Sequence, residues 1–235
     1  MRYKNIVPAV FLSRPNRFIA QVEIDGRTET VHVKNTGRCR ELLVNGCRVW
    51  LEKSENPARR TAYDLIAAEK QREGLPPLLV NMDSQLPNAV AEEWLRAGAL
   101  FPEGSIIRRE VTYGSSRFDF CIEHEGSTSF LEVKGVTLEN GGIASFPDAP
   151  TERGVKHLNE LIECKKNGLG AYILFVIQME EMKLFRPNDI THREFGDTLR
   201  RAIDCGVECI AAGCTVTPEE VRIDRIIPIN TEVML

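Results

Sequence analysis

The spacing of apolar residues changes near Gly74-Leu75-Pro76-Pro77, and this change limits the choice of fold more than any other feature. Before it, short runs alternate apolar and polar residues and end at turn signals. Residues 17–24 have a period near two and run into Asp25-Gly26, a strong hairpin signal. Residues 61–69 fit a strand or a helix equally well. The pattern predicts an all-β module over residues 1–80, a small barrel or sandwich.

Residues 81–235 combine strand and helix periodicities. Asn88 is expected to cap a helix over 89–98, and Asp148, with Pro150 in the first turn, to open a helix that ends near Lys166. The remaining predicted elements are strands at 106–113, 117–123, 129–134, 171–177 and 207–210, and a helix near 195–204. The order of these elements predicts a mixed α/β sheet in a second domain.

Composition places the chain among globular proteins, since 43% of its residues are hydrophobic and 27% are charged. No apolar run approaches the ~18 residues of a membrane span. Arg14 and Arg17 interrupt the N-terminal segment before a signal-peptide core can form. The sequence therefore predicts a cytoplasmic protein with no membrane partner.

The seven cysteines are an odd number without a secretion signal, so we expect reduced thiols. Cys205, Cys209 and Cys214 lie close in sequence, but they lack a C-x-x-C pair and a nearby histidine. They are a weak zinc signal, and burial in the core is the better expectation.

The net charge of −4 conceals an asymmetry along the chain. Residues 1–80 carry 14 Lys and Arg against 9 Asp and Glu, whereas the remaining residues carry 16 against 25. A basic module joined to an acidic one suggests separate tasks, although a fluctuation in surface charge would look the same.

The residues that point to chemistry are Asp119 and the run Glu132-Val133-Lys134. Side chains alternate along a strand, so Glu132 and Lys134 share a face, and a hairpin at Gly126 would lay Asp119 beside them. Two neighbouring carboxylates repel each other unless a cation neutralises them, and Mg²⁺ prefers such oxygen ligands. Lys134 would then orient the attacking water and stabilise the developing negative charge. An exposed, solvated strand face is the alternative, but the surrounding residues are apolar.

Asp119, a hairpin, Glu-x-Lys, a helix and a buried strand together form the pattern of the PD-(D/E)xK nuclease superfamily. More closely, the chain resembles the sugar fermentation stimulation protein A family over nearly its whole length. The segments that carry the resemblance are Asn35-Thr36-Gly37, Ser116-Arg117-Phe118-Asp119-Phe120, Glu132-Val133-Lys134-Gly135-Val136-Thr137-Leu138, Phe146-Pro147-Asp148-Ala149-Pro150-Thr151-Glu152-Arg153-Gly154 and Lys156-His157-Leu158. Phe118 stands where the superfamily has its proline.

The resemblance implies an N-terminal OB-fold barrel, a C-terminal restriction-endonuclease-like domain and DNA as the partner. Asp119, Glu132 and Lys134 match the catalytic residues, and Asp119 and Glu132 match the metal ligands. Glu93 matches an additional helix acid, with its neighbour Glu92 as the other choice. The implied cofactor is Mg²⁺, or Mn²⁺ in its place.

Basic residues of both modules are candidates for nucleic-acid binding. The start of the helix near residue 152 offers backbone N–H groups for a phosphate, although Lys156 there can equally form ion pairs along the helix. In the barrel, a positive groove beside Phe18 or Tyr63 would suit a single strand, and scattered solvated charge is the alternative. The candidate contacts are Arg14, Arg17, Lys34, Arg38, Arg40, Arg153, Lys156 and His157.

The sequence thus predicts a two-domain DNA-binding protein with an Mg²⁺-dependent phosphodiesterase site. The first alternative is a DNA-binding regulator of sugar metabolism whose nuclease-like site is catalytically silent. A module that interacts with sugar metabolism without binding nucleic acid is the second, and no glycan platform or phosphosugar loop supports it.

Overall fold

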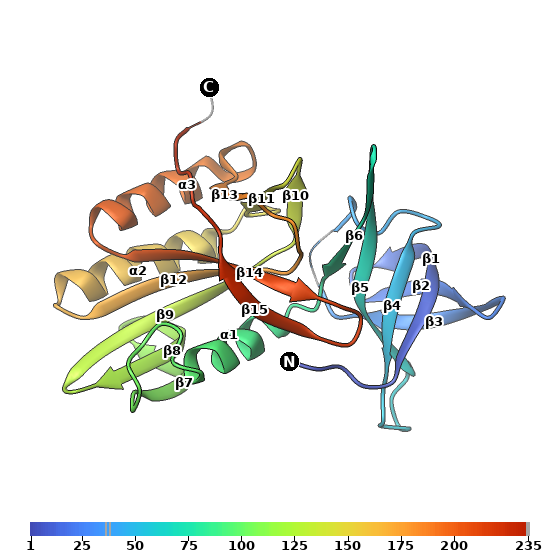
Figure 1. Cartoon of the computed structure of the whole chain (residues 1–235), viewed down its shortest axis with the longest axis horizontal. Coiled ribbons are helices and arrows are strands. Elements are labelled where there is room, and N and C mark those ends of the chain that lie inside the picture. The colour runs from blue at the N-terminus through green and yellow to red at the C-terminus, as the bar shows by residue number, and fades with distance from the viewer. Residues whose placement is uncertain (36, 38, 234–235) are drawn as a thin grey trace. The chain divides into compact units, whose positions relative to one another are not determined.

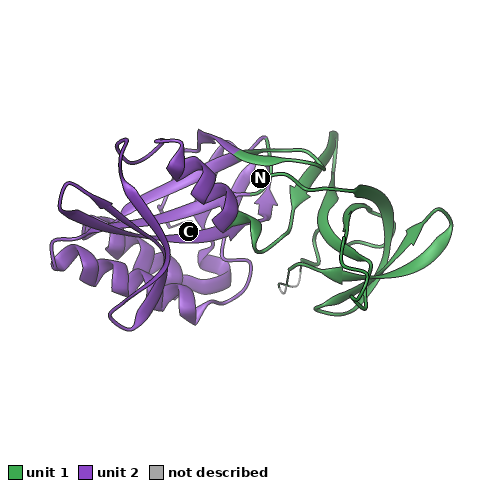
Figure 2. Ribbon diagram, turned by 90° about the horizontal axis from the view of Figure 1, so that it is seen from below, with its two compact units in different colours: residues 1–87, 178–180, 214–222 green, residues 88–177, 181–213, 223–235 purple. Residues whose placement is uncertain are grey.

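The computed structural model describes residues 1–35, 37 and 39–233. The chain forms two compact units (Figure 2). The first contains Met1–Pro87, Gln178–Glu180 and Cys214–Arg222. The second contains Asn88–Ile177, Glu181–Gly213 and Ile223–Leu235. Two short segments from late in the sequence therefore belong to the first unit.

The first unit is built on a sheet of six strands, blue to green in Figure 1. They are β1 (Ile6–Asn16), β2 (Ile19–Ile24), β3 (Arg27–Val33), β4 (Arg48–Lys53), β5 (Tyr63–Arg72) and β6 (Leu75–Asn81). Their order is β3-β2-β1-β4-β5-β6, and an additional parallel pairing of β3 with β5 closes the sheet into a barrel. The predicted barrel is confirmed, and the segment that fitted a strand or a helix forms β5 from Tyr63 onward.

Local sequence explains the first part of the barrel. Asp25 and Gly26 both have positive φ, 49° and 75°, which is the backbone of a two-residue hairpin turn between β2 and β3. The alternation of the strands sends one set of side chains into the barrel, where they are fully buried: Ala20, Val22, Val31, Val49, Leu51 and Leu65.

A charged cluster stabilises the place where the barrel closes. His32 on β3 lies opposite Asp64 on β5 in the parallel ladder. The Asp64 carboxylate accepts hydrogen bonds from His32 Nδ1 at 2.8 Å and from both terminal nitrogens of Arg59, at 2.6 and 2.7 Å. Burial opposes the ionisation of Asp64, but the bonds from Arg59 and His32 outweigh it, so the pKa of Asp64 is lowered.

The later elements form a second six-stranded sheet with helices. The sheet has the order β15-β14-β12-β9-β8-β7, and β10, β11 and β13 form a small separate sheet. The strands are β7 (Ile106–Tyr113), β8 (Ser116–His124), β9 (Ser127–Val136), β10 (Leu138–Asn140), β11 (Ile143–Phe146), β12 (Gly170–Ile177), β13 (Leu184–Pro187), β14 (Glu208–Val216) and β15 (Val221–Ile226). The helices are α1 (Leu86–Arg96), α2 (Glu152–Lys166) and α3 (Asp189–Asp204).

The predicted mixed sheet is confirmed, because β9, β12 and β14 run parallel while β7, β8 and β9 are antiparallel neighbours. The apolar run of β12 is its centre, and the last five residues of that strand are almost wholly buried. Helix α2 packs on β9 and β12, and α3 packs beside α2 (Figure 1). A central strand buried on both faces explains why residues 171–177 lack polar alternation.

The structure corrects the beginning of three helices. Helix α2 starts at Glu152, because Thr151 is its N-cap and accepts from the Gly154 N–H at 3.1 Å. Asp148 is excluded since Ala149 precedes a proline and avoids helical geometry. Helix α1 starts at Leu86, so Asn88 lies inside it and caps nothing. Helix α3 starts at Asp189, well before residue 195, with a non-helical residue at His192.

The structure also bears on the expectations for the cysteines and for membrane-spanning segments. All seven cysteines lie among the described residues and none forms a disulfide there; Cys214 is buried, Cys205 is exposed, and burial raises the pKa of Cys209 to about 12. Among the described residues, the group that has metal-ligand spacing contains none of these three cysteines. Among the described residues, no helix is both long and apolar enough to cross a membrane.

The barrel closure makes a prediction about stability. Because its pKa is lowered, Asp64 stabilises the fold above the unfolded-state pKa of about 3.9, and this contribution is lost as the pH falls through the folded-state pKa. Asp64→Asn should lower the free energy of unfolding at pH 7 by about 1–3 kcal/mol, and the difference should shrink in acid. Urea unfolding between neutral pH and pH 3 measures this. Asp25→Asn, in an exposed turn, is the control; equal losses in both variants would contradict the account.

Candidate metal centre

The hairpin of β8 and β9 brings the predicted acids and lysine together. Glu125 and Gly126 both have positive φ, 46° and 79°, and form the predicted tight turn. Glu132 and Lys134 then point to the same side of β9, with Lys134 Nζ 2.5 Å from Glu132 Oε1. Asp119 on β8 is close enough for the charges of Glu132 and Lys134 to act on its ionisation. The three groups therefore share one site.

Asp119 is held by donors from two elements. The paired register of β8 and β9 ends at Phe120 and Leu131, and just beyond it the Val133 N–H donates to Asp119 Oδ2 at 2.8 Å. The side chain of Asn88, on α1, donates to Asp119 Oδ1 at 2.8 Å. Both carboxylate oxygens are thus oriented by the protein.

Glu132 is 2% exposed and uses only one of its oxygens. Lys134 and His157 Nδ1 both contact Oε1, while Oε2 is buried without a hydrogen-bond partner among the described residues. Arg153 Nε donates to His157 Nε2 at 3.3 Å. A guanidinium can only donate, so His157 Nε2 is the acceptor of that bond. His157 Nδ1 therefore carries the ring proton and donates a hydrogen bond to Glu132.

The two carboxylates differ in acidity. Burial raises the pKa of Asp119, and the charge of Glu132 raises it further, against the bonds from Val133 and Asn88. Burial also opposes the ionisation of Glu132, but the bond from His157 and the charge of Lys134 outweigh it and lower its pKa. The contacts of Glu132 therefore favour its ionised form, whereas burial and the neighbouring charge of Glu132 disfavour the ionised form of Asp119.

Helix α1 contributes a residue that the sequence analysis did not assign to the site. Glu92 forms ion pairs with Arg96 at 2.8 Å and Arg109 at 3.0 Å, and the side chain of Glu93 is exposed. Asn88, on the same helix, contacts Asp119. In the sequence, Asn88 was interpreted as the cap of this helix, and no other pattern pointed to it. Metal binding by Glu93 stays a prediction.

A second group of potential ligands lies between the start of α2 and the kink of α3. Glu152, His192 and Glu194 place one ligand atom each within 4.8 Å of one another. The Thr151 N–H donates to His192 Nδ1 at 3.2 Å, so the ring proton is on Nε2, which faces Glu152 at 3.5 Å. A metal would need the lone pair of that nitrogen, and this tautomer does not offer it.

The predicted basic contacts on α2 have different environments. Lys156 is half exposed; its Nζ donates to the Ser115 carbonyl at 2.9 Å and lies 3.8 Å from Glu160. Arg153 is exposed on the first turn of the helix. His157 is only 4% exposed and contacts Glu132, so the structure places it beneath the carboxylate and away from the surface.

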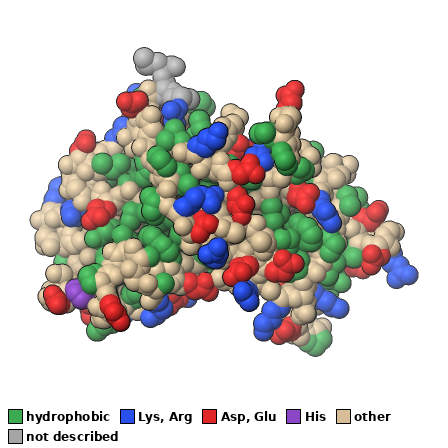
Figure 3. Space-filling view, viewed as in Figure 1, with side chains coloured by type: hydrophobic (Ala, Val, Ile, Leu, Met, Phe, Trp, Pro, Cys, Tyr) green, Lys and Arg blue, Asp and Glu red, His purple; other side chains and the backbone are tan. Residues whose placement is uncertain are grey.

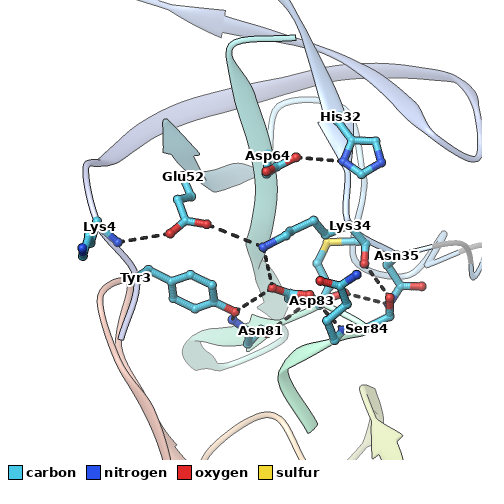
Figure 4. Close-up of polar contacts among 12 residues, drawn as sticks. Tyr3, Lys4, His32, Lys34, Asn35, Glu52, Asp64, Asn81, Asp83 and Ser84 are labelled. Atoms are coloured by element: carbon cyan, nitrogen blue, oxygen red, sulfur yellow. Dashed lines mark hydrogen bonds and ion pairs between the residues drawn. The ribbon is translucent and has the colours of Figure 1, made fainter. Parts of the chain in front are cut away.

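In the barrel, two of the predicted basic contacts are engaged by the protein itself. Arg14 donates to the carbonyl oxygens of Gly37, Arg17 and Asn35 at 2.6–2.8 Å. Figure 4 shows Lys34 between two carboxylates, Asp83 at 3.0 Å and Glu52 at 3.6 Å.

The other barrel candidates have no such demonstrated structural role. Arg17 and Arg40 are exposed, and Arg38 lies outside the described residues. On the face drawn in Figure 3, Lys and Arg are interspersed with Asp and Glu. Binding of nucleic acid by these residues stays a prediction.

Comparison with known proteins settles the family. Residues 12–75 match the family domain described as "SfsA N-terminal OB domain", and residues 85–220 match "Sugar fermentation stimulation protein RE domain". The chain belongs to the sugar fermentation stimulation protein family. A homologue from Clostridium beijerinckii is 52% identical over 223 residues, 95% of this chain and 96% of that protein. One from Clostridium tetani is 47% identical and covers 94% of this chain and 96% of that protein.

A solved structure in this family has the same fold. SfsA from Pyrococcus furiosus, solved in complex with Ca²⁺, matches with a TM-score of 0.83 and 28% identity, over 98% of each chain. This likeness confirms the predicted two-part fold of an OB barrel followed by a mixed-sheet domain.

The histidine beneath Glu132 makes a prediction about stability. His157→Ala removes a proton donor from a buried carboxylate, so the free energy of unfolding should fall by about 1–3 kcal/mol. His157→Gln retains a donor and should lose less. Denaturant unfolding measures both variants, with His124→Ala, on a less buried strand end, as the control. A loss no larger than that of the control would show that the contact is unimportant.

Proposed function

We propose that this chain hydrolyses phosphodiester bonds of nucleic acid, with DNA as the substrate, at Asp119, Glu132 and Lys134. The observation that carries the proposal is the buried Oε2 of Glu132, which has no hydrogen-bond partner among the described residues, in a residue whose charge acts on a second carboxylate, Asp119. A buried acceptor without a partner is costly, and a bound cation would satisfy it. Paired carboxylates that lack a cation also repel each other.

Mg²⁺ or Mn²⁺ is the cofactor that we propose for this site. The oxygens of Asp119 and Glu132 are hard donors of the kind that these ions prefer. When bound, the ion would activate water and stabilise the negative charge that develops on the phosphate oxygens. The Pyrococcus furiosus relative was solved with Ca²⁺, another cation that takes oxygen ligands, and this supports a divalent ion.

The protein groups around the ligands have separable tasks. Asn88 and the Val133 N–H orient Asp119, while His157 and Lys134 keep Glu132 ionised. Lys134 is partly accessible, with 14% of its side chain exposed, and can place its positive charge beside a bound phosphate. Lys156 and Arg153, on the first turns of α2, are the nearest candidates on that helix for holding the nucleic-acid backbone.

One observation favours a different function, a DNA-binding regulatory protein whose nuclease-like site is silent. Lys134 already pairs with Glu132 and compensates its charge without a metal. In that case the protein would bind DNA, and the site of Asp119 and Glu132 would not turn over, whether or not it takes up an ion.

Cleavage assays separate these functions. Nicking of supercoiled plasmid should require Mg²⁺ or Mn²⁺, stop with chelator, and fall at least about 100-fold in Glu132→Gln, since charge-stabilising groups contribute on this scale. Glu123→Gln, on the neighbouring strand, should retain activity. Thermal unfolding would verify that both variants fold. Equal cleavage by Glu132→Gln would contradict the proposal. Calorimetric Mg²⁺ binding without cleavage of single-stranded, duplex, branched or RNA substrates would support the silent regulator.

A further inference from the structure

An exposed aromatic ring in the first unit stands on a backbone held by hydrogen bonds. Phe18 stands in the turn between β1 and β2 and is 45% exposed. Its N–H donates to Asn16 Oδ1 at 2.9 Å, and its carbonyl accepts from the Val33 N–H at 2.8 Å. The Arg17 guanidinium lies over one face of the ring, 4.9 Å from its centre. An exposed ring on an anchored backbone, beside a cation, is a suitable surface for stacking a nucleobase.

Phe18 shares a pocket with His32, whose ring has a defined polarity. Asp64 is ionised because its pKa is lowered, and an ionised carboxylate can only accept. His32 Nδ1 therefore carries the ring proton and donates a hydrogen bond to Asp64 (Figure 4). In the neutral ring, Nε2 is left with a lone pair, and 37% of the side chain is exposed. The pocket thus contains an oriented hydrogen-bond acceptor next to an aromatic surface.

The cations that line this pocket already have carboxylate partners. Arg59 forms two hydrogen bonds to Asp64, and Lys34 pairs with Asp83 and Glu52. A phosphate would have to compete with these carboxylates, whereas a flat uncharged group would not. The pocket volume, about 330 Å³, is near the lower end of ordinary ligand pockets and suits a small ring system.

We propose that this pocket binds one unpaired nucleobase of a single-stranded nucleic acid, stacked on Phe18 and donating an N–H to His32 Nε2. The inference rests on the nucleic-acid partner of the proposed function and adds a preference for unpaired strands. In a duplex the N–H groups of the Watson–Crick edge are occupied by pairing and the ring faces by stacking. The exposed Arg17 is placed to contact the adjoining phosphate.

Fluorescence anisotropy with a labelled single-stranded DNA oligonucleotide tests the pocket. The full chain is titrated in chelator, so that cleavage at Asp119 and Glu132 plays no part. Phe18→Ala should weaken binding at least about 5-fold, the lower end of base–aromatic stacking effects. Phe18→Trp should retain affinity. Leu75→Ala, which removes another exposed apolar side chain of the same unit, is the matched control and should bind like the parent protein.

A strand of the same length made of abasic residues keeps the phosphates and removes the bases. It should bind weakly, and equally to the parent protein and to Phe18→Ala. Unchanged affinity of Phe18→Ala for the normal strand, or tight binding of the abasic strand, would overturn the pocket. If duplex DNA binds and Phe18→Ala does not change the affinity for the single strand, only the proposed base-binding role of the pocket is wrong. If the parent protein binds neither strand nor duplex, the nucleic-acid partner fails with it.

Discussion

The second unit depends on the contacts that hold the buried carboxylate of Glu132. A charge at 2% exposure is tolerable only with close partners, and Lys134 and His157 supply them on a single oxygen. The other oxygen is buried without a hydrogen-bond partner among the described residues, and the charge of Glu132 acts on a neighbouring acid, Asp119. The same contacts that stabilise the charge therefore leave a ligand atom available, which is why fold and proposed chemistry depend on the same residues.

Each unit contains a buried acid whose charge is compensated by a histidine and a cationic side chain. In the barrel, Asp64 is neutralised by Arg59 and His32 at the closing ladder, and both of its oxygens are occupied. In the second unit, Glu132 keeps one oxygen without a partner among the described residues. Full satisfaction suits a structural role, and incomplete satisfaction is typical of a ligand site. This contrast supports placing the metal chemistry in the second unit and ligand recognition by an oriented histidine in the first.

Sequence reasoning succeeded where the determining physics is local. The turn at Gly126 and the two-residue period of β9 were enough to bring Glu132 and Lys134 onto one face. It failed where tertiary packing decides. Asn88 meets Asp119 only because α1 lies beside β8, and no local pattern contains that contact. His157 has a polar pattern typical of a surface helix, yet the packing of α2 on β9 buries it.

The central claim is that Asp119 and Glu132 hold one divalent ion, and anomalous X-ray diffraction from crystals soaked in Mn²⁺ tests it most directly. We expect an anomalous peak within ligand distance of Glu132 Oε2 and an Asp119 oxygen, lost in crystals of Glu132→Gln. A peak at Glu152, His192 and Glu194 instead, or an unchanged peak in the variant, would contradict the account.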